Sequence, residues 1–173
     1  MTPAGVRPEV ARPGQESVWD YPRPPRVEPT GEHVVVRLGG VVVAETARRH
    51  PALRVLETSH PPTYYLPVAA FGPGSLEPGQ GSSWCEFKGT AAYLDLIGGV
   101  AGAVRITSAA WTYPRPSPGF EALTDHVALY PGRVDEVTVD GERVRPQTGG
   151  FYGGWITDRV VGPFKGGPGT AGW

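Results

Sequence analysis

The sequence predicts a mainly β fold, and three observations lead to this expectation. Val outnumbers Leu 21 to 9, and β-branched residues favour strands over helices. The 25 Gly and 20 Pro residues make up about a quarter of the 173 residues and place turns at short intervals. Several short segments alternate apolar and polar residues, as half-buried strands do. We therefore expect a sandwich, a barrel or a related two-sheet β fold.

Composition also bounds the class of protein and its partners. Hydrophobic residues make up 39% of the chain and the net charge is −1, which favours a folded domain over disorder. The 16 basic and 17 acidic residues are interspersed, so we expect neither a nucleic-acid nor a membrane partner. Cys85, the single cysteine, excludes an internal disulfide. The start MTPAGVRPEV lacks the apolar core of a signal peptide, so we expect a cytoplasmic protein.

Two arms are expected to flank a core domain. Residues 1–30 contain the runs RPEVARPG and YPRPPRVEP, which cannot donate a regular ladder of hydrogen bonds and predict an extended, Pro-rich N-terminal arm. Residues 149–173 are rich in Gly and aromatic residues, which predicts a C-terminal arm that packs across the domain surface. The core domain is then expected to span residues 31–148.

The core contains a succession of strand and turn signals. His33–Leu38 and Val41–Glu45 flank Gly39-Gly40, which suits a tight hairpin turn, and VTVDGERV predicts a second hairpin around Asp140-Gly141. Val68–Gln80, diluted by Gly and Pro, is expected to be a loop, and Phe120–Asp125 a single helical turn. Further strands are expected at Leu53–Thr58, Thr63–Leu66, Ser82–Phe87, Ala92–Ile97, Val104–Tyr113 and Val127–Tyr130.

No standard catalytic or metal-binding motif occurs in the chain. His33, His50, His60 and His126 are scattered, and no pair of them shows the spacing of metal ligands. We therefore expect no metal and no cofactor.

One of two segments dense in functional side chains runs from Arg54 to Tyr65. Glu57 lies near the end of the predicted strand, and Ser59 and His60 lie in a turn that Pro61-Pro62 stiffens, where side chains commonly meet ligands. The two neighbouring tyrosines Tyr64 and Tyr65 point to opposite faces of a strand, so only one of them can line a pocket. The same pattern also suits a strand, a rigid turn and two half-buried tyrosines without a functional role.

The second segment runs from Trp84 to Tyr93. Strand alternation puts Trp84, Glu86 and Lys88 on one face. Cys85 beside Phe87 is typical of a small buried side chain, although a thiol near a cation or a histidine can ionise and attack. Lys88 at the strand end is well placed to meet the carboxylate of a ligand, and a salt bridge to Glu86 is the alternative.

Six blocks of the sequence resemble one family. The blocks ESVWDYPRPPRVEP, LETSHPPTYYLP, CEFKGTAAYLDL, SAAWTYPRP, ALYPGRVD and GGFYGGW resemble the signatures of the bacterial and fungal family catalogued as domain of unknown function 427. The resemblance runs from about Glu16 to Gly166. It implies a fold similar to the β-tent class, in which two small antiparallel sheets meet at an angle, as in methionine sulfoxide reductase B and the Mss-type zinc chaperones.

The chain departs from these relatives in two ways. The β-tent relatives usually carry paired C-x-x-C zinc ligands, which a chain with one cysteine cannot supply. The family is also labelled nucleotidyltransferase-like, but such enzymes need clustered carboxylates for Mg²⁺, and the sequence contains no such cluster.

The function expected from these residues is binding of a small molecule in a polar-aromatic pocket on the concave side of the tent. A small anionic or carbonyl-containing metabolite suits such walls, and whether the protein is also a metal-independent enzyme stays open. The alternative is a non-enzymatic protein-interaction or self-association module, for example a homodimer, that uses the Pro-rich and aromatic arms. The candidates for chemistry are His60, Glu57, Lys88 and Cys85, and the candidates for ligand contact are Arg54, Ser59, Tyr64, Tyr65, Tyr93, Trp111 and Tyr113.

Overall fold

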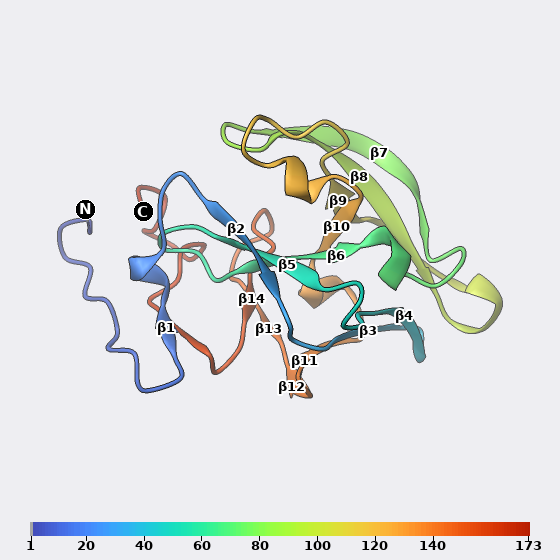
Figure 1. Ribbon diagram of the computed structural model, residues 1–173, viewed down its shortest axis with the longest axis horizontal. Coiled ribbons are helices and arrows are strands. Elements are labelled where there is room, and N and C mark those ends of the chain that lie inside the picture. The colour runs from blue at the N-terminus through green and yellow to red at the C-terminus, as the bar shows by residue number, and fades with distance from the viewer. Residues whose placement is uncertain (1) are drawn as a thin grey trace.

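The larger of two main sheets is antiparallel, with the strand order β2-β5-β6-β10-β9-β8-β7, and extends from β2 and β5 near the middle of Figure 1 to β8 and β7 at its upper right. This computed structural model describes residues 2–173. The seven strands are β2 (Arg26–Thr30), β5 (Ala52–Leu56), β6 (Thr63–Pro67), β7 (Leu76–Cys85), β8 (Gly89–Gly98), β9 (Val104–Thr112) and β10 (His126–Leu129).

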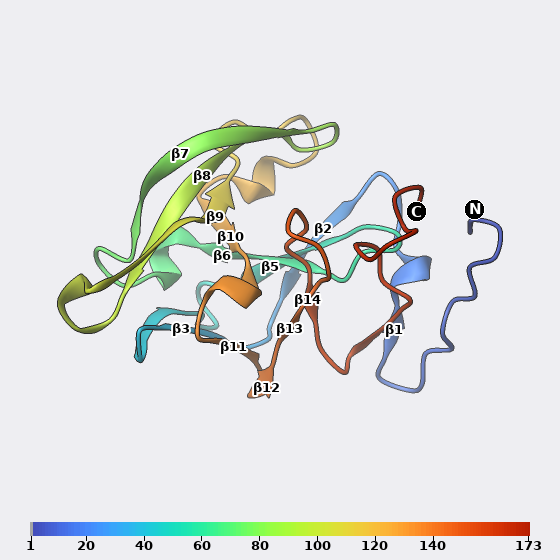
Figure 2. The ribbon, with the colours of Figure 1, turned by 180° about the vertical axis from the view of Figure 1, so that it is seen from behind.

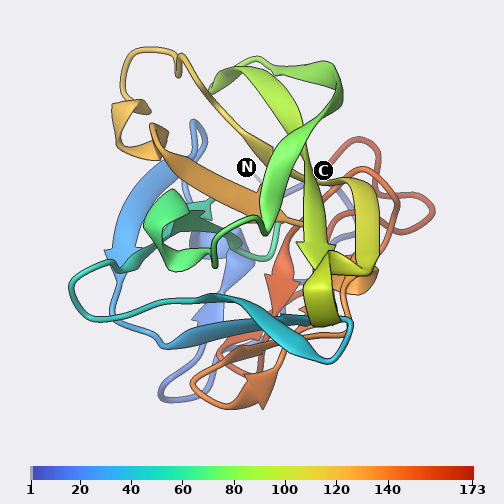
Figure 3. The same ribbon diagram turned by 90° about the vertical axis from the view of Figure 1, so that its right-hand side faces the viewer.

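A smaller antiparallel sheet consists of two hairpins in the order β12-β11-β3-β4. Gly39 and Gly40 both have positive φ, as do Asp140 and Gly141, which is the backbone that two-residue hairpin turns require. Both predicted hairpins are therefore confirmed. In Figure 3 the β7–β8 pair, green to yellow-green, rises above the blue β3–β4 hairpin. The strands are β3 (Val34–Leu38), β4 (Val41–Glu45), β11 (Glu136–Val139) and β12 (Glu142–Arg143).

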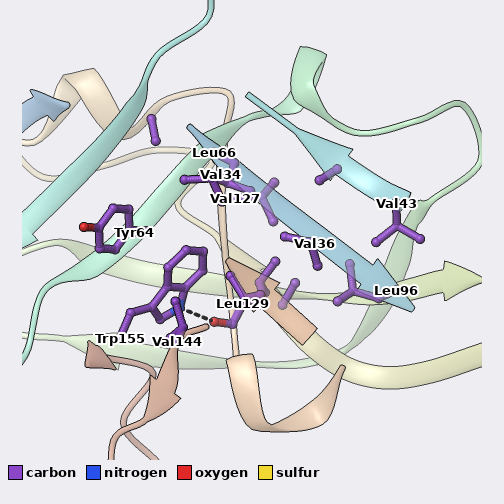
Figure 4. Packing of buried hydrophobic residues seen from close by; sticks show 14 of the residues in the cluster. Val34, Val36, Val43, Tyr64, Leu66, Leu96, Val127, Leu129, Val144 and Trp155 are labelled. Carbon is purple, nitrogen blue, oxygen red and sulfur yellow. Dashed lines mark hydrogen bonds between the residues drawn. The ribbon is translucent and has the colours of Figure 1, made fainter. Parts of the chain in front are cut away.

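The main core lies between the two sheets (Figure 4). Alternate residues of β3, such as Val34 and Val36, face this core, and β6, β8 and β10 contribute buried Leu and Val side chains from the larger sheet. Trp155 joins them from the C-terminal arm and donates its indole N–H to the carbonyl oxygen of Leu129 over 3.2 Å. The fold is thus mainly β with several antiparallel sheets, consistent with the β-tent class.

The arms pack on the core, and both termini lie at the same end of the molecule (Figures 1 and 2). β1 (Glu16–Ser17) pairs in parallel with β15 (Val160–Val161), and β13 (Arg145–Pro146) pairs with β14 (Trp155–Ile156). β2 lies within the expected N-terminal arm but forms an edge of the large sheet, where Pro29 is tolerated because one side of the strand has no partner. The large sheet therefore begins at Arg26.

One loop expectation was wrong. Val68–Gln80 contains a short 3₁₀ turn, η2 (Val68–Ala70), but β7 already begins at Leu76. β7 is an edge strand, and its register with β8 shifts between Pro78 and Ser82, so the Gly and Pro residues lie in an irregular part of that edge. Composition alone predicts a loop there because it does not show that the segment pairs with β8 at the edge of the sheet, where Gly and Pro are tolerated.

The helical segments are all short 3₁₀ turns. The single helical turn predicted at Phe120–Asp125 is confirmed as η4 (Glu121–Leu123). No helix within residues 2–173 has the length and apolar character needed to cross a membrane. The remaining turns are η1 (Val18–Asp20), η3 (Val100–Gly102) and η5 (Pro131–Arg133).

Candidate functional site

A cavity of about 300 Å³ lies over one face of the larger sheet and under the C-terminal arm. Strands β5, β6, β7, β8 and β9 each contribute at least one side chain to its wall, and the β5–β6 and β7–β8 connections contribute others. Eight of the candidate residues line it: Glu57, His60, Tyr65, Cys85, Lys88, Tyr93, Trp111 and Tyr113.

Aromatic side chains form the apolar part of the wall. The Trp111 indole N–H donates to the Tyr65 hydroxyl over 3.3 Å, and the two rings meet edge to face. Burial raises the pKa of Tyr65 and of Tyr113 well above the usual value, and the Tyr65 hydroxyl and the Cys85 thiol raise that of Tyr113 further. Both phenols therefore keep their protons at physiological pH and can act as hydrogen-bond donors.

Lys88 lies in the three-residue turn between β7 and β8 and is only 9% exposed. Gly89 has φ 95°, which ends the turn in a conformation that favours glycine, and the Lys88 carbonyl accepts from Ser117 N–H. Within residues 2–173 the ammonium group has no ion-pair or hydrogen-bond partner, and the alternative salt bridge to Glu86 is not formed. A lysine whose side chain is largely buried and has no carboxylate partner within residues 2–173 thus lines the cavity.

The turn also corrects the expected alternation. A continuous strand to Phe87 predicts that Trp84, Glu86 and Lys88 share a face, but β7 ends at Cys85. Trp84 is 71% exposed and Glu86 is exposed, whereas Lys88 turns inward. Cys85 is a free, half-buried thiol on the cavity wall.

His60 and Glu57 come from the turn between β5 and β6. Glu57 pairs with Arg23 over 3.3 Å and lies 4.0 Å from His60 Nε2. Burial, followed by the positive charges of Lys165, Arg23 and Lys88, lowers the pKa of His60 to about 3. His60 is therefore a neutral imidazole at physiological pH.

Three of the candidate residues lie away from the cavity. Arg54 is buried and pairs with Glu16 and Glu28 beneath the N-terminal arm. Ser59 is fully buried, and among the described residues 2–173 its hydroxyl has no hydrogen-bond partner.

Tyr64 is the third of these residues. It donates to Glu32 over 2.8 Å and stacks on Trp155, so of the two neighbouring tyrosines it is Tyr65 that lines the cavity.

The C-terminal arm and the segment just before it supply wall residues that sequence reasoning missed. Gln147, Tyr152 and Lys165 line the cavity, and the Lys165 ammonium lies 5.8 Å from the centre of the Tyr152 ring. The sequence feature that indicates this part of the wall is the second Gly-Gly pair of GGFYGGW, Gly153-Gly154. A Cβ atom at Gly153 would overlap the Trp111 ring, so only glycine lets the arm approach the aromatic wall this closely.

No three His, Cys, Asp or Glu side chains within residues 2–173 gather as metal ligands would. Fold and site together define a mainly β protein with an aromatic cavity and an unpaired cation on its wall.

Comparison with known proteins identifies the family. Residues 26–140, about two thirds of the chain, match the family described as domain of unknown function (DUF427), and the protein belongs to this family. A search of curated proteins finds no match. The matched region contains Glu57, His60, Lys88 and Trp111, whereas Gln147 and Lys165 follow it.

Proposed function

We propose that this protein binds a small metabolite with an anionic or carbonyl group in the cavity over the larger sheet. The unpaired ammonium of Lys88 is the observation that carries the proposal. Holding a charge where it is partly removed from water and has no partner costs free energy, so such a charge is often functional. A bound anion would supply the missing partner.

The rest of the wall suits the same kind of ligand. Tyr65, Trp111 and Tyr113 offer flat apolar surfaces, and a few polar groups converge among them, which is the usual composition of a small-molecule site. The exposed rings of Trp84 and Phe151 lie at the same cavity and would contact the outer part of the ligand.

Self-association through the arms is less well supported. Most large aromatic side chains of the arms are used within the chain: Trp155 is 1% exposed, and Trp19 donates to the Pro163 carbonyl oxygen over 3.0 Å. These contacts explain the aromatic residues without a second chain, so we favour the cavity.

A thermal-shift screen of small carboxylates, phosphates and ketones against the wild-type protein tests the proposal, followed by calorimetric titration of the hits. A hydrogen bond to a charged group contributes about 1.5–3 kcal/mol. We therefore expect Lys88→Met to weaken a hit about tenfold to a hundredfold.

Arg48→Met, which removes an exposed cation away from the cavity, is the matched control and should bind as the wild type does. A screen without a hit, or a hit that Lys88→Met binds equally well, would contradict the proposal. The expected cytoplasmic location stays a prediction from the sequence, and cell fractionation tests it.

A further inference from the structure

We propose that Gln147 positions His60 as a neutral hydrogen-bond donor whose ring proton is on Nε2, and that this donor and the Lys88 ammonium together select a carboxylate over the corresponding amide. The ligand half of this inference rests on the proposed function. The state of the His60 ring does not, because it can be measured without any ligand.

The orientation of the Gln147 side-chain amide is set by two main-chain groups. Oε1 accepts from Gly154 N–H over 3.1 Å, and Nε2 donates to the Lys165 carbonyl oxygen over 2.8 Å. A main-chain N–H can only donate and a main-chain carbonyl can only accept, so exchanging the amide oxygen and nitrogen would break both bonds. Gln147 is 5% exposed, which makes that exchange costly.

This orientation determines which nitrogen of His60 carries the proton. Nε2 of Gln147 lies 3.3 Å from Nδ1 of His60 and presents its second N–H to it. Nδ1 must then accept, so the proton of the neutral ring is on Nε2. The same contact disfavours the doubly protonated ring, since its Nδ1–H would face another donor.

The Nε2–H is available to a ligand. Its nearest carboxylate, Glu57, lies 4.0 Å away, beyond hydrogen-bond distance, and is paired with Arg23. The Tyr152 ring packs edge to face on the imidazole, with ring centres 4.9 Å apart, and limits its rotation. His60 therefore offers the cavity a donor with a restricted direction.

The two groups favour a ligand that only accepts hydrogen bonds. A lysine ammonium has donors and no acceptor, and the His60 ring presents a donor as well. A carboxylate has two oxygens that can accept from both groups, whereas an amide would turn its NH₂ toward one of them. A site built in this way discriminates strongly, because the mismatched ligand leaves buried donors facing each other.

The C-terminal arm is shaped for this contact. A Cβ atom at Gly154 would overlap Gln147 Oε1 and the Pro61 ring, so glycine lets the arm come close enough to hold the amide. Lys165 N–H also donates to the Ser59 carbonyl oxygen over 2.8 Å, which ties the arm to the turn that carries His60.

A long-range ¹H–¹⁵N correlation spectrum of the ¹⁵N-labelled, full-length protein tests the ring state, with the His60 signals assigned by their loss in His60→Asn. We expect a protonated Nε2 and a bare Nδ1 with no titration between about pH 5 and 8. A proton on Nδ1, or a ring that titrates in this range, would overturn the inference.

Gln147→Glu isolates the role of Gln147. The carboxylate oxygen that replaces Nε2 is an acceptor, so we expect the proton to move to Nδ1 or the ring to become doubly protonated. Gln80→Glu makes the same change at an exposed position outside the cavity and should leave the His60 spectrum unchanged. An unaltered ring in a folded Gln147→Glu protein would show that Gln147 has no positioning role. If this variant does not fold, the wild-type spectrum still shows which ring nitrogen of His60 carries the proton.

Benzoate and benzamide test the ligand half, because they share a flat ring that suits the aromatic wall. We expect wild-type protein to bind benzoate at least tenfold more tightly than benzamide in an NMR titration. Equal affinities would overturn the selection of a carboxylate. If neither probe binds while the ring is in the expected state, the ligand half and the proposed function both lose support, and the role of Gln147 stands.

Discussion

Replacement of Lys88 by methionine should make the ligand-free protein more stable. Methionine has a similar length and no charge, so it can occupy the same volume without requiring a partner. In the wild type the Lys88 side chain is largely buried, and within residues 2–173 its ammonium has no hydrogen-bond or ion-pair partner. Stability and binding should thus change in opposite directions at this position.

The size of the gain follows from the cost of burying an unpaired polar group, about 1–3 kcal/mol in proteins. Lys88 borders a cavity that water can enter, so the lower end applies, about 1 kcal/mol. For a chain of this length, 1 kcal/mol raises the melting temperature by roughly 2–4 °C.

Arg54→Met is the matched control, because it removes a buried cation that does have partners. The Arg54 side chain is 3% exposed and pairs with Glu16 and Glu28. Removing one member of a buried pair costs about 3–5 kcal/mol, and the partly exposed glutamates reduce this to about 2 kcal/mol. Urea unfolding at pH 7 measures both variants. If Lys88→Met destabilises the protein as Arg54→Met does, the Lys88 ammonium makes a stabilising contact in the ligand-free protein, and the prediction is wrong.

Two other predictions concern close packing and pH. Gly153→Ala should destabilise the protein by about 1–3 kcal/mol because the new methyl group overlaps Trp111, whereas Gly150→Ala, with open space around it, should be tolerated; thermal melts of both compare them, and equal melting temperatures would contradict the close contact. Burial works to raise the pKa of Glu16 and of Glu32, but their hydrogen bonds to tyrosine, threonine and arginine groups outweigh it and the pKa of each is lowered. Their contribution to stability is therefore complete above the pKa of the unfolded chain, near 4.3, and is lost as the pH falls through the lower pKa of the folded state. Urea unfolding from pH 6 to 3 should show a smaller loss of stability for Glu32→Gln than for the wild type, and an identical slope would exclude this role.

Local sequence patterns predicted most strands because the signals act over a few residues. Gly39-Gly40 and Asp140-Gly141 adopt the positive φ of hairpin turns, which these residue types favour, and alternation in β3 sorts its residues between core and outside. The wrong loop at Val68–Gln80 depended on pairing with β8, where the partner of Leu76 is Leu96, outside a window of ten residues. The early end of β7 depended on the turn before Gly89, which alternation alone does not reveal.

The sequence predicted which segments carry the candidate site, but it did not predict how their side chains are arranged around one cavity. Glu57, His60, Tyr65, Lys88 and Trp111 belong to short, chemically dense blocks, and the fold brings them to one cavity. Whether a given side chain in such a block faces that cavity depends on strand pairing.

The sequence by itself therefore determined the β class, the turns and the chemistry available in each block, since these follow from backbone preferences and residue types. Only the tertiary structure decided that Tyr65 and not Tyr64 meets the cavity, that the Lys88 ammonium has no partner in the described part of the chain, and that Gln147 contacts His60 from 87 positions along the chain. The physical reason is that burial and pairing are properties of neighbours in space. A linear sequence records those neighbours only where they are also close along the chain.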